Sequence, residues 1–295
     1  MPGYFVYLPH GIDGVHLLTM EAAMVVSILG CGWYGKALAK MLLKNGLTVK
    51  GSSTSEGKLG SSQAIGIRPY LIKFEAEDEL IDPDFFNCDI LLVSIPPKLK
   101  AGEGDYYLHK IRRIIKSCVK YAIRKVIYIS STGVYGEYDC NVDELNEPRP
   151  DTPSGLVLLE AEALFQEEHS FKTTIIRFGG LIGPHRHPGR FFAGKTNIPN
   201  GLAPVNLVHQ SDCIGITMAV IEQNAFGYLL NAVSPDHPSK SDYYSEMSVK
   251  ADLPIPEFIN ELKSWKIVNS VNLSEVLKYE FRFQNLKEYT FDATE

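Results

Sequence analysis

The stretch Val25-Val26-Ser27-Ile28-Leu29-Gly30-Cys31-Gly32-Trp33-Tyr34-Gly35 runs from an apolar segment directly into a G-x-G-x-x-G motif. The apolar segment predicts a buried strand, and the residues after the motif have helical spacing. In this context Gly30 permits a tight turn, Gly32 lets the backbone approach a pyrophosphate, and Gly35 allows close packing of the helix on the strand. The helix N-terminus would face the anion. The motif predicts a dinucleotide site in which Trp33 and Tyr34 also contact the cofactor.

Alternating apolar and amphipathic segments continue along the chain from Met24. This alternation is typical of βαβ units, and right-handed crossovers then produce a Rossmann-type, doubly wound parallel sheet. We expect helices at Tyr34–Asn45, Asp105–Ala122 and Leu156–His169. We expect strands at Val25–Leu29, Leu47–Lys50, Pro69–Phe74, Asp89–Ile95, Lys125–Ile129 and Thr174–Phe178.

The chain is expected to divide into a dinucleotide-binding domain over residues 24–178 and, mainly, a substrate lobe over 179–295. Glycine and proline pairs are frequent after Arg177 and predict a small, loop-rich lobe beside the sheet. Residues 1–23 form a leader without Lys or Arg, and its apolar stretch is broken by polar residues, unlike a signal peptide. We assign this leader no fold, and whether it belongs to the native protein or is an upstream extension stays open.

Charge and cysteine content exclude several classes of function. The net charge of -6 and the pI near 5.8 give no broad attraction to nucleic acid or to anionic membranes, and no segment reaches the length of a membrane span. The five cysteines are odd in number and lack the close pairs of zinc sites or secreted frameworks. We therefore expect reduced thiols, a cytoplasmic protein, no metal, and no nucleic-acid or membrane partner.

The end of the second strand bears on the choice of cofactor. An Asp or Glu there would bind the ribose 2′-hydroxyl of NAD and repel a 2′-phosphate. Here the hydroxyls of Ser52, Ser53 and Thr54 are followed by Lys58. This set favours NADP, with NAD as the second choice, and Glu56 counts against the 2′-phosphate.

The end of the fourth strand is expected to line the same cleft. It reads Ser94-Ile95-Pro96-Pro97, and two adjacent prolines predict a rigid turn rather than a helix start. We therefore include Ser94 and Pro96 among the cofactor-binding residues.

Later motifs carry a resemblance to a known family. Ile129–Gly136 reads I-S-S-T-G-V-Y-G, Arg177–Pro184 reads R-F-G-G-L-I-G-P, and Asn206–Asp212 and Leu229–Ala232 follow in the same order. From Met24 to about Phe291 the chain resembles the extended short-chain dehydrogenases/reductases, the group that contains NAD-dependent epimerases/dehydratases acting on nucleotide sugars. The resemblance implies that segments of about 205–232 return to the Rossmann core, and that two copies pair through the helices beside strand five.

The resemblance also assigns catalytic positions, and two of them differ. Ser131 stands where the family has a Ser or Thr that polarises the reacting oxygen, but Ser154 and Leu158 stand where it has a Tyr-x-x-x-Lys pair. A phenol with a pKa of about 10 can be tuned by a nearby ammonium, whereas a serine hydroxyl without a base cannot. The chain thus resembles the atypical members of the family, and Ser131 and Ser154 stay candidate catalytic residues.

A basic loop offers a substitute proton donor. His185-Arg186-His187-Pro188-Gly189-Arg190, with His209 further on, gathers cationic and titratable side chains where the nicotinamide end of the cleft is expected. His185 is the best-placed general acid near neutral pH, and the loop would suit an anionic small-molecule substrate. Nucleotide-sugar enzymes of the family often carry an Asn and an Arg at two further positions, which here hold Gly180 and Val205. These differences argue against a nucleoside diphosphate held in the family's usual way.

Three hypotheses of function follow. The first is an NAD(P)-dependent oxidoreductase or epimerase/dehydratase-like enzyme acting on a small polar or sugar-like substrate. The second is a non-catalytic NADP(H)-binding sensor or regulatory protein, for which the missing Tyr and Lys are expected. The third, an interaction module with an empty cleft, conflicts with the intact glycine motif.

Overall fold

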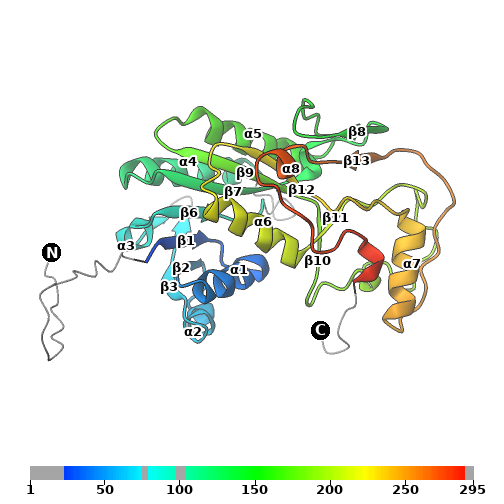
Figure 1. The fold of residues 1–295 in the computed structure, drawn as a ribbon, viewed down its shortest axis with the longest axis horizontal. Coiled ribbons are helices and arrows are strands. Elements are labelled where there is room, and N and C mark those ends of the chain that lie inside the picture. Colours follow the sequence, from blue (N-terminus) through cyan, green and yellow to red (C-terminus); the bar gives the residue numbers. More distant parts are fainter. Residues whose placement is uncertain (1–22, 75–78, 98–103, 290–295) are drawn as a thin grey trace, which may run out of the picture.

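A seven-stranded parallel sheet forms the centre of the molecule (Figure 1). The structure is a computed structural model that describes residues 23–74, 79–97 and 104–289. Apart from Ala23, the leader lies outside the described residues. Helices cover both faces, which confirms the predicted doubly wound α/β fold. The strand order across the sheet is β12 (Leu229–Ala232), β9 (Lys172–Phe178), β7 (Lys125–Ser131), β6 (Ile90–Val93), β1 (Val25–Leu29), β2 (Thr48–Ser53) and β3 (Arg68–Leu71).

Burial on both faces explains why the strands are nearly continuous apolar runs. In β6 the side chains of Ile90 and Leu92 enter one hydrophobic core, and those of Leu91 and Val93 enter the other. One face packs against α1 (Trp33–Lys44) and α6 (Gln210–Glu222). The opposite face packs against α3 (Pro83–Phe86), α4 (Gly104–Lys120) and α5 (Pro153–Glu167).

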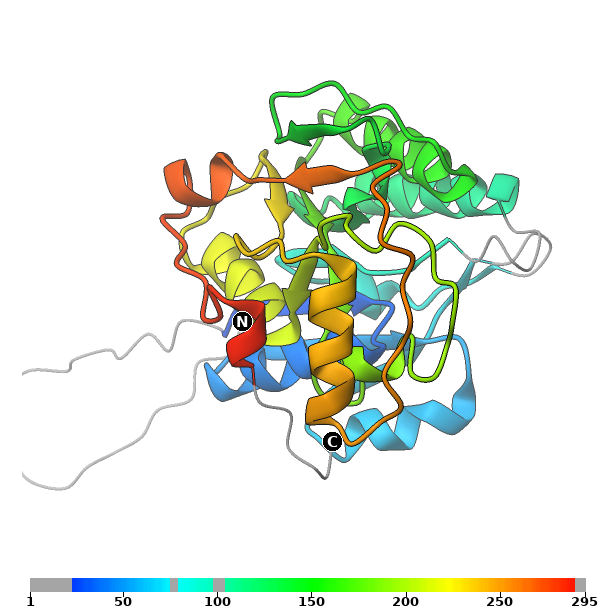
Figure 2. The ribbon, with the colours of Figure 1, turned by 90° about the vertical axis from the view of Figure 1, so that its right-hand side faces the viewer.

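The C-terminal part adds a lobe at the side of the sheet toward which the strands' carboxyl ends point (Figures 1 and 2). Its helix α7 (Lys240–Lys250) packs on a small core with β10 (Gly180–Ile182) and β11 (Leu207–His209). The remaining short elements are α2 (Leu59–Gln63), β4 (Lys73–Phe74), β5 (Glu79–Leu80), β8 (Cys140–Val142), β13 (Lys266–Val268), α8 (Asn272–Glu275) and the single-turn helices Glu56–Lys58, Thr132–Val134, Pro188–Arg190 and Leu286–Glu288.

Several predicted boundaries are wrong by a few residues. Helix α5 begins at Pro153 rather than Leu156, because the Thr152 side chain caps it by accepting a hydrogen bond from the Gly155 N–H at 3.1 Å. Strand β2 continues to Ser53 rather than ending at Lys50, since its last four residues pair with β3. The predicted strand Pro69–Phe74 instead divides into β3 and β4.

A buried ion pair joins α5 to β9. Arg177 Nη2 lies 2.6 Å from Glu162 Oε2, and both side chains are almost fully buried. Arg177 also donates to the Tyr135 hydroxyl at 2.6 Å, and Ser130 donates to Glu162 at 2.5 Å. Burial opposes the guanidinium charge, but contact with Glu162 outweighs it and raises the pKa of Arg177. The pair fixes the helix that carries Ser154 against β9 and, through Ser130, against β7, which ends in Ser131.

Removal of Glu162 tests this structural role. Glu162→Ala leaves the Arg177 charge buried without a carboxylate to balance it, so we expect the free energy of unfolding to fall by about 3–5 kcal/mol. Glu160→Ala on the same helix removes only an exposed pair with Arg112 at 3.5 Å, and should cost at most about 1 kcal/mol. Urea unfolding followed by circular dichroism measures both, and equal losses would contradict the assignment.

Candidate functional site

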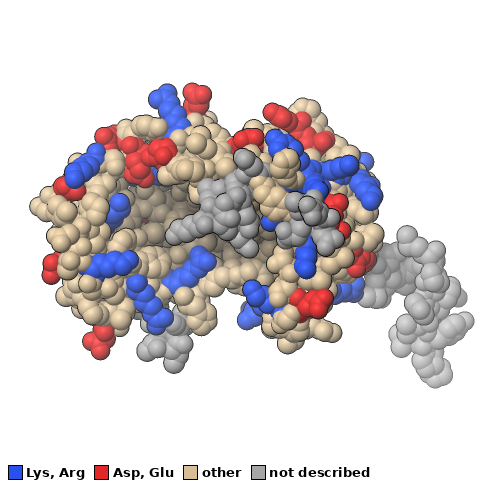
Figure 3. Space-filling view, turned by 180° about the vertical axis from the view of Figure 1, so that it is seen from behind, with Lys and Arg blue, Asp and Glu red and all other residues tan. Residues whose placement is uncertain are grey.

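Two adjoining cavities lie at the carboxyl ends of the central strands. The β2 cavity, of about 430 Å³, is lined by residues of β1, β2, β4, α1 and α4 and by the segments that follow β1, β2 and β6. The β7 cavity, of about 350 Å³, is lined by residues of β7, β9, α1 and α5 and by the loop after β10. They share Gly30, Gly32, Trp33, Ser94, Ile95 and Pro96. The glycine-rich turn therefore lies at the middle of one elongated cleft. The space-filling view from behind shows a hollow bordered by Lys and Arg side chains (Figure 3).

The glycines of the turn meet different constraints. Gly30 has φ +95°, and a Cβ there would lie 2.7 Å from the Ser94 carbonyl oxygen, so no other residue fits without a backbone shift. A Cβ on Gly35 would lie 3.0 Å from the Gly30 oxygen, which explains the close packing of α1 on β1. Gly32 meets nothing within 4 Å and faces the cleft. Protein packing therefore explains Gly30 and Gly35 but not Gly32, where the missing side chain leaves space for a ligand.

The predicted residues at the end of β2 line the β2 cavity in different ways. The Ser52 hydroxyl accepts a hydrogen bond from the Gly30 N–H at 3.0 Å and so holds the turn in place. The Ser53 hydroxyl accepts from the Ser55 N–H at 3.1 Å. Thr54 and Lys58 are exposed at the edge of the cavity. Thr54 and Lys58 are therefore the members of this group best placed to meet a ligand.

Positive charge gathers around the β2 cavity. Lys36, Lys58 and Lys110 line it, and no Asp or Glu does so among the described residues. Lys36 follows Gly35 in the first turn of α1 and donates to the Ser61 hydroxyl at 2.9 Å. By contrast Lys50, on β2, is buried, and its Nζ lies 3.2 Å from Asp84 Oδ2. The cavity is thus suited to a negatively charged group.

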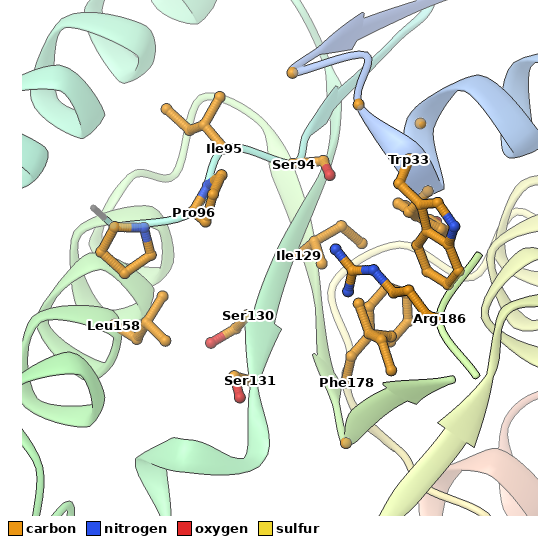
Figure 4. A pocket seen from close by; sticks show the side chains of 17 residues that line it. Trp33, Ser94, Ile95, Pro96, Ile129, Ser130, Ser131, Leu158, Phe178 and Arg186 are labelled. Carbon is orange, nitrogen blue, oxygen red and sulfur yellow. The ribbon is translucent and has the colours of Figure 1, made fainter. Parts of the chain in front are cut away.

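The β7 cavity combines hydroxyl groups with apolar walls (Figure 4). Ser131 lines it, and its hydroxyl oxygen accepts from the Gly133 N–H at 3.1 Å. Leu158 points into the cavity from α5, where the resemblance places a Lys. Ser154 lies one helical turn earlier and is exposed, outside the residues that line the cavity. Helix α5 contains no Lys, so it offers no ammonium group to the hydroxyls of this cavity.

The basic loop contributes Arg186 rather than His185 to the cavity lining. His185 is exposed in a left-handed conformation, with φ 62°. The guanidinium carbon of Arg186 lies 4.4 Å from the centroid of the Trp33 ring. His185 is the adjacent residue, outside the cavity lining in this structure.

The grouping of His209 with the cationic loop is wrong. This residue is buried at the end of β11 between Phe283 and Tyr289, and its Nδ1 accepts from the Ser211 N–H at 3.1 Å. Burial, with Arg282 nearby, lowers the pKa of His209 from 6.5 to about 4. The side chain is therefore neutral near pH 7 and supports the start of α6 instead of donating a proton in the cleft.

Sequence reasoning did not select Lys36, Lys110, Ser130 or Arg186 as site residues. The position of Lys36 directly after the motif could have marked it, since the first turn of the helix faces the bound anion. The other three depend on which face of a helix, strand or loop turns toward the cleft. Among the described residues no group of three or more His, Cys, Asp or Glu side chains could hold a metal ion, and none of the described helices combines the length and apolar character of a membrane span.

Comparison with known proteins identifies the family. A sequence model of the NAD dependent epimerase/dehydratase family matches residues 100–213. Protein YeeZ of Escherichia coli K12 is 35% identical over 264 residues, covering 88% of this chain and 96% of YeeZ. The chain belongs to the NAD-dependent epimerase/dehydratase family.

Solved structures of this family share the fold. The UDP-glucuronic acid 4-epimerase of Bacillus cereus, in complex with NAD, has a TM-score of 0.71 at 22% identity and covers 87% of this chain and 91% of its own. The UDP-glucose 4-epimerase of Thermotoga maritima, with UDP-glucose, has a TM-score of 0.72 at 16% identity and covers 90% and 96%. The predicted resemblance to the epimerase/dehydratase group is confirmed.

Proposed function

We propose that this chain binds NADP(H) along the cleft and acts as an oxidoreductase or epimerase/dehydratase-like enzyme on a small polar or sugar-like substrate. The observation that carries the proposal is the pairing of two cavities at one glycine-rich turn. A dinucleotide has two nucleoside ends joined by a pyrophosphate, and the cleft offers two chambers joined at Gly32 and the N-terminus of α1.

The charge of the β2 cavity supports NADP over NAD. An adenosine ribose held there would lie beside Ser53, Thr54 and Lys58, where no described residue offers a carboxylate to accept from a 2′-hydroxyl. Lys36 and Lys110 add further positive potential around the same space. A 2′-phosphate fits this set of donors, and Ser94 and Pro96 complete the wall opposite.

The chemistry would take place in the β7 cavity. A bound nicotinamide supplies a hydride donor or acceptor. The Ser131 oxygen already accepts from Gly133, so its own O–H proton is free to be donated to a substrate oxygen. Ser154 offers a second hydroxyl on the exposed start of α5. We propose that His185, next to Arg186 at the edge of the cavity, moves the proton when substrate is bound.

A non-catalytic sensor is the second candidate. The observation that favours it is Leu158, which presents an apolar side chain to the cavity where the family carries a cation. In this reading bound NADP(H) fixes the loop after β10 and thereby a partner interaction. The expected homodimer through α4 and α5, which pack on each other, stays a prediction in either case.

Gly32→Val tests the dinucleotide site. The free protein has space for the new side chain, so the free energy of unfolding should change by less than about 1 kcal/mol. The valine would occupy the path of the pyrophosphate, so NADP+ binding measured by calorimetry should be lost. Gly60→Val in α2 also meets nothing within 4 Å and should bind normally. Unchanged NADP+ affinity in the Gly32 variant would refute the site.

Lys58→Gln tests the choice of cofactor. Loss of this charge should weaken NADP+ binding by about tenfold and leave NAD+ binding nearly unchanged, because only NADP+ carries the 2′-phosphate. Lys40→Gln, an exposed lysine on α1 outside both cavities, is the control. Equal weakening of both cofactors would show that Lys58 does not recognise a 2′-phosphate.

Turnover separates the enzyme from the sensor. Absorbance of NADPH is followed with a panel of sugars, aldehydes and keto acids. An enzyme oxidises NADPH with at least one substrate, Ser131→Ala slows this step without changing NADPH affinity, and His185→Gln alters its pH profile. Tight NADPH binding without turnover across the panel would favour the sensor.

A further inference from the structure

We propose that Arg186 is the binding residue for an anionic group, a carboxylate or a phosphate, on the substrate of this cleft. This inference rests on the proposed function, because it places the substrate beside a bound dinucleotide. It names a substrate class: a small molecule that carries the anionic group at one end and the reacting oxygen at the other.

The backbone directs Arg186 into the cavity. A tight turn joins Gly183 to Arg186, with the Arg186 N–H donating to the Gly183 oxygen at 2.8 Å. His185 adopts its left-handed conformation inside this turn. Figure 4 shows the Arg186 side chain reaching from this loop across Trp33, with its guanidinium in the cavity.

Trp33 holds the guanidinium in place. The indole Nε1 donates to the Pro184 oxygen at 2.6 Å, and Gln210 donates to the Trp33 oxygen at 3.3 Å. The ring is therefore fixed to the same loop that carries Arg186, and the planar guanidinium lies 4.4 Å from its centroid. A cation positioned in advance loses less conformational entropy when it binds an anion.

Arg186 forms no ion pair with any side chain in the described part of the chain. No described carboxylate lies within ion-pair distance of it, and of the described residues that line the β7 cavity it alone is charged. The neighbouring walls are apolar, with Ile129, Phe178 and Leu181. A carboxylate or phosphate can accept two parallel hydrogen bonds from such a guanidinium.

The position of Ser131 sets the orientation of the substrate. Ser131 and Arg186 lie on different sides of the cavity (Figure 4). A molecule anchored at Arg186 by its anionic group could thus present a hydroxyl or carbonyl oxygen to Ser131. Small hydroxy or keto acids and phosphorylated sugars have this arrangement.

Arg186 could instead contact the cofactor pyrophosphate, since Trp33 belongs to the glycine-rich turn. The two assignments differ in one respect: a substrate anion binds together with NADP+, whereas an anion that occupies the pyrophosphate position competes with it. A competition measurement therefore separates them.

The experiment is calorimetric titration of malonate, and separately of inorganic phosphate, into protein saturated with NADP+. We expect at least one anion to bind. Arg186→Gln should weaken that binding by about tenfold or more, because a charge-assisted hydrogen bond is lost. Arg190→Gln removes the same charge from the same loop outside the cavity, and should change the affinity by less than about twofold. Malonamide, the uncharged analogue of malonate, should not bind.

Three results would overturn the inference: no binding of either anion, equal binding by the Arg186 variant, or displacement of NADP+ by the anion. Failure of the proposed function is a different result, in which NADP+ itself does not bind to the wild-type protein. The same titrations on the free protein would then still compare Arg186→Gln with Arg190→Gln, and equal affinities would reject the anion site.

Discussion

The close approach between the turn after β1 and the end of β6 is the constraint on which the cleft depends. A side chain at Gly30 would lie 2.7 Å from the Ser94 carbonyl oxygen, and one at Gly35 would lie 3.0 Å from the Gly30 oxygen. These contacts bring the N-terminus of α1 to the centre of the cleft and leave the backbone at Gly32 open to a ligand. The same turn carries Trp33, whose indole holds the loop after β10. One short segment therefore positions both cavities.

The β7 cavity is supported by contacts between α5 and the strands β7 and β9. The buried pair of Glu162 and Arg177 joins α5 to β9, and Ser130 donates to the same carboxylate. These contacts orient the strand that ends in Ser131 and the helix that presents Leu158. Leu158 stands where the resemblance places a Lys, so this wall of the cavity is apolar. Among the described residues, the positive charge that lines this cavity comes from Arg186, on the loop after β10.

Much of the fold could be predicted from the sequence, because buried parallel strands and their glycine turn leave strong local patterns. The limits of β2 could not, since Gly51–Ser53 is polar and becomes strand only by pairing with β3. Helix α7 was not predicted, because the lobe is packed through long-range contacts with few periodic signals. The glycine motif and the ends of the second and fourth strands were enough to predict that the glycines, Ser52, Ser94 and Pro96 line the cleft. The roles of Arg186 and His209 depend on side-chain direction and burial, which adjacent positions in a sequence do not reveal.

We propose that the glycine-rich turn and its two cavities form a dinucleotide site that prefers the 2′-phosphate of NADP. The most direct test is equilibrium titration of the wild-type protein with NADPH and, in parallel, with NADH, followed by nicotinamide fluorescence. We expect saturable binding of one NADPH per chain, with an affinity at least about tenfold higher than that for NADH. The absence of saturable binding by either cofactor would contradict it.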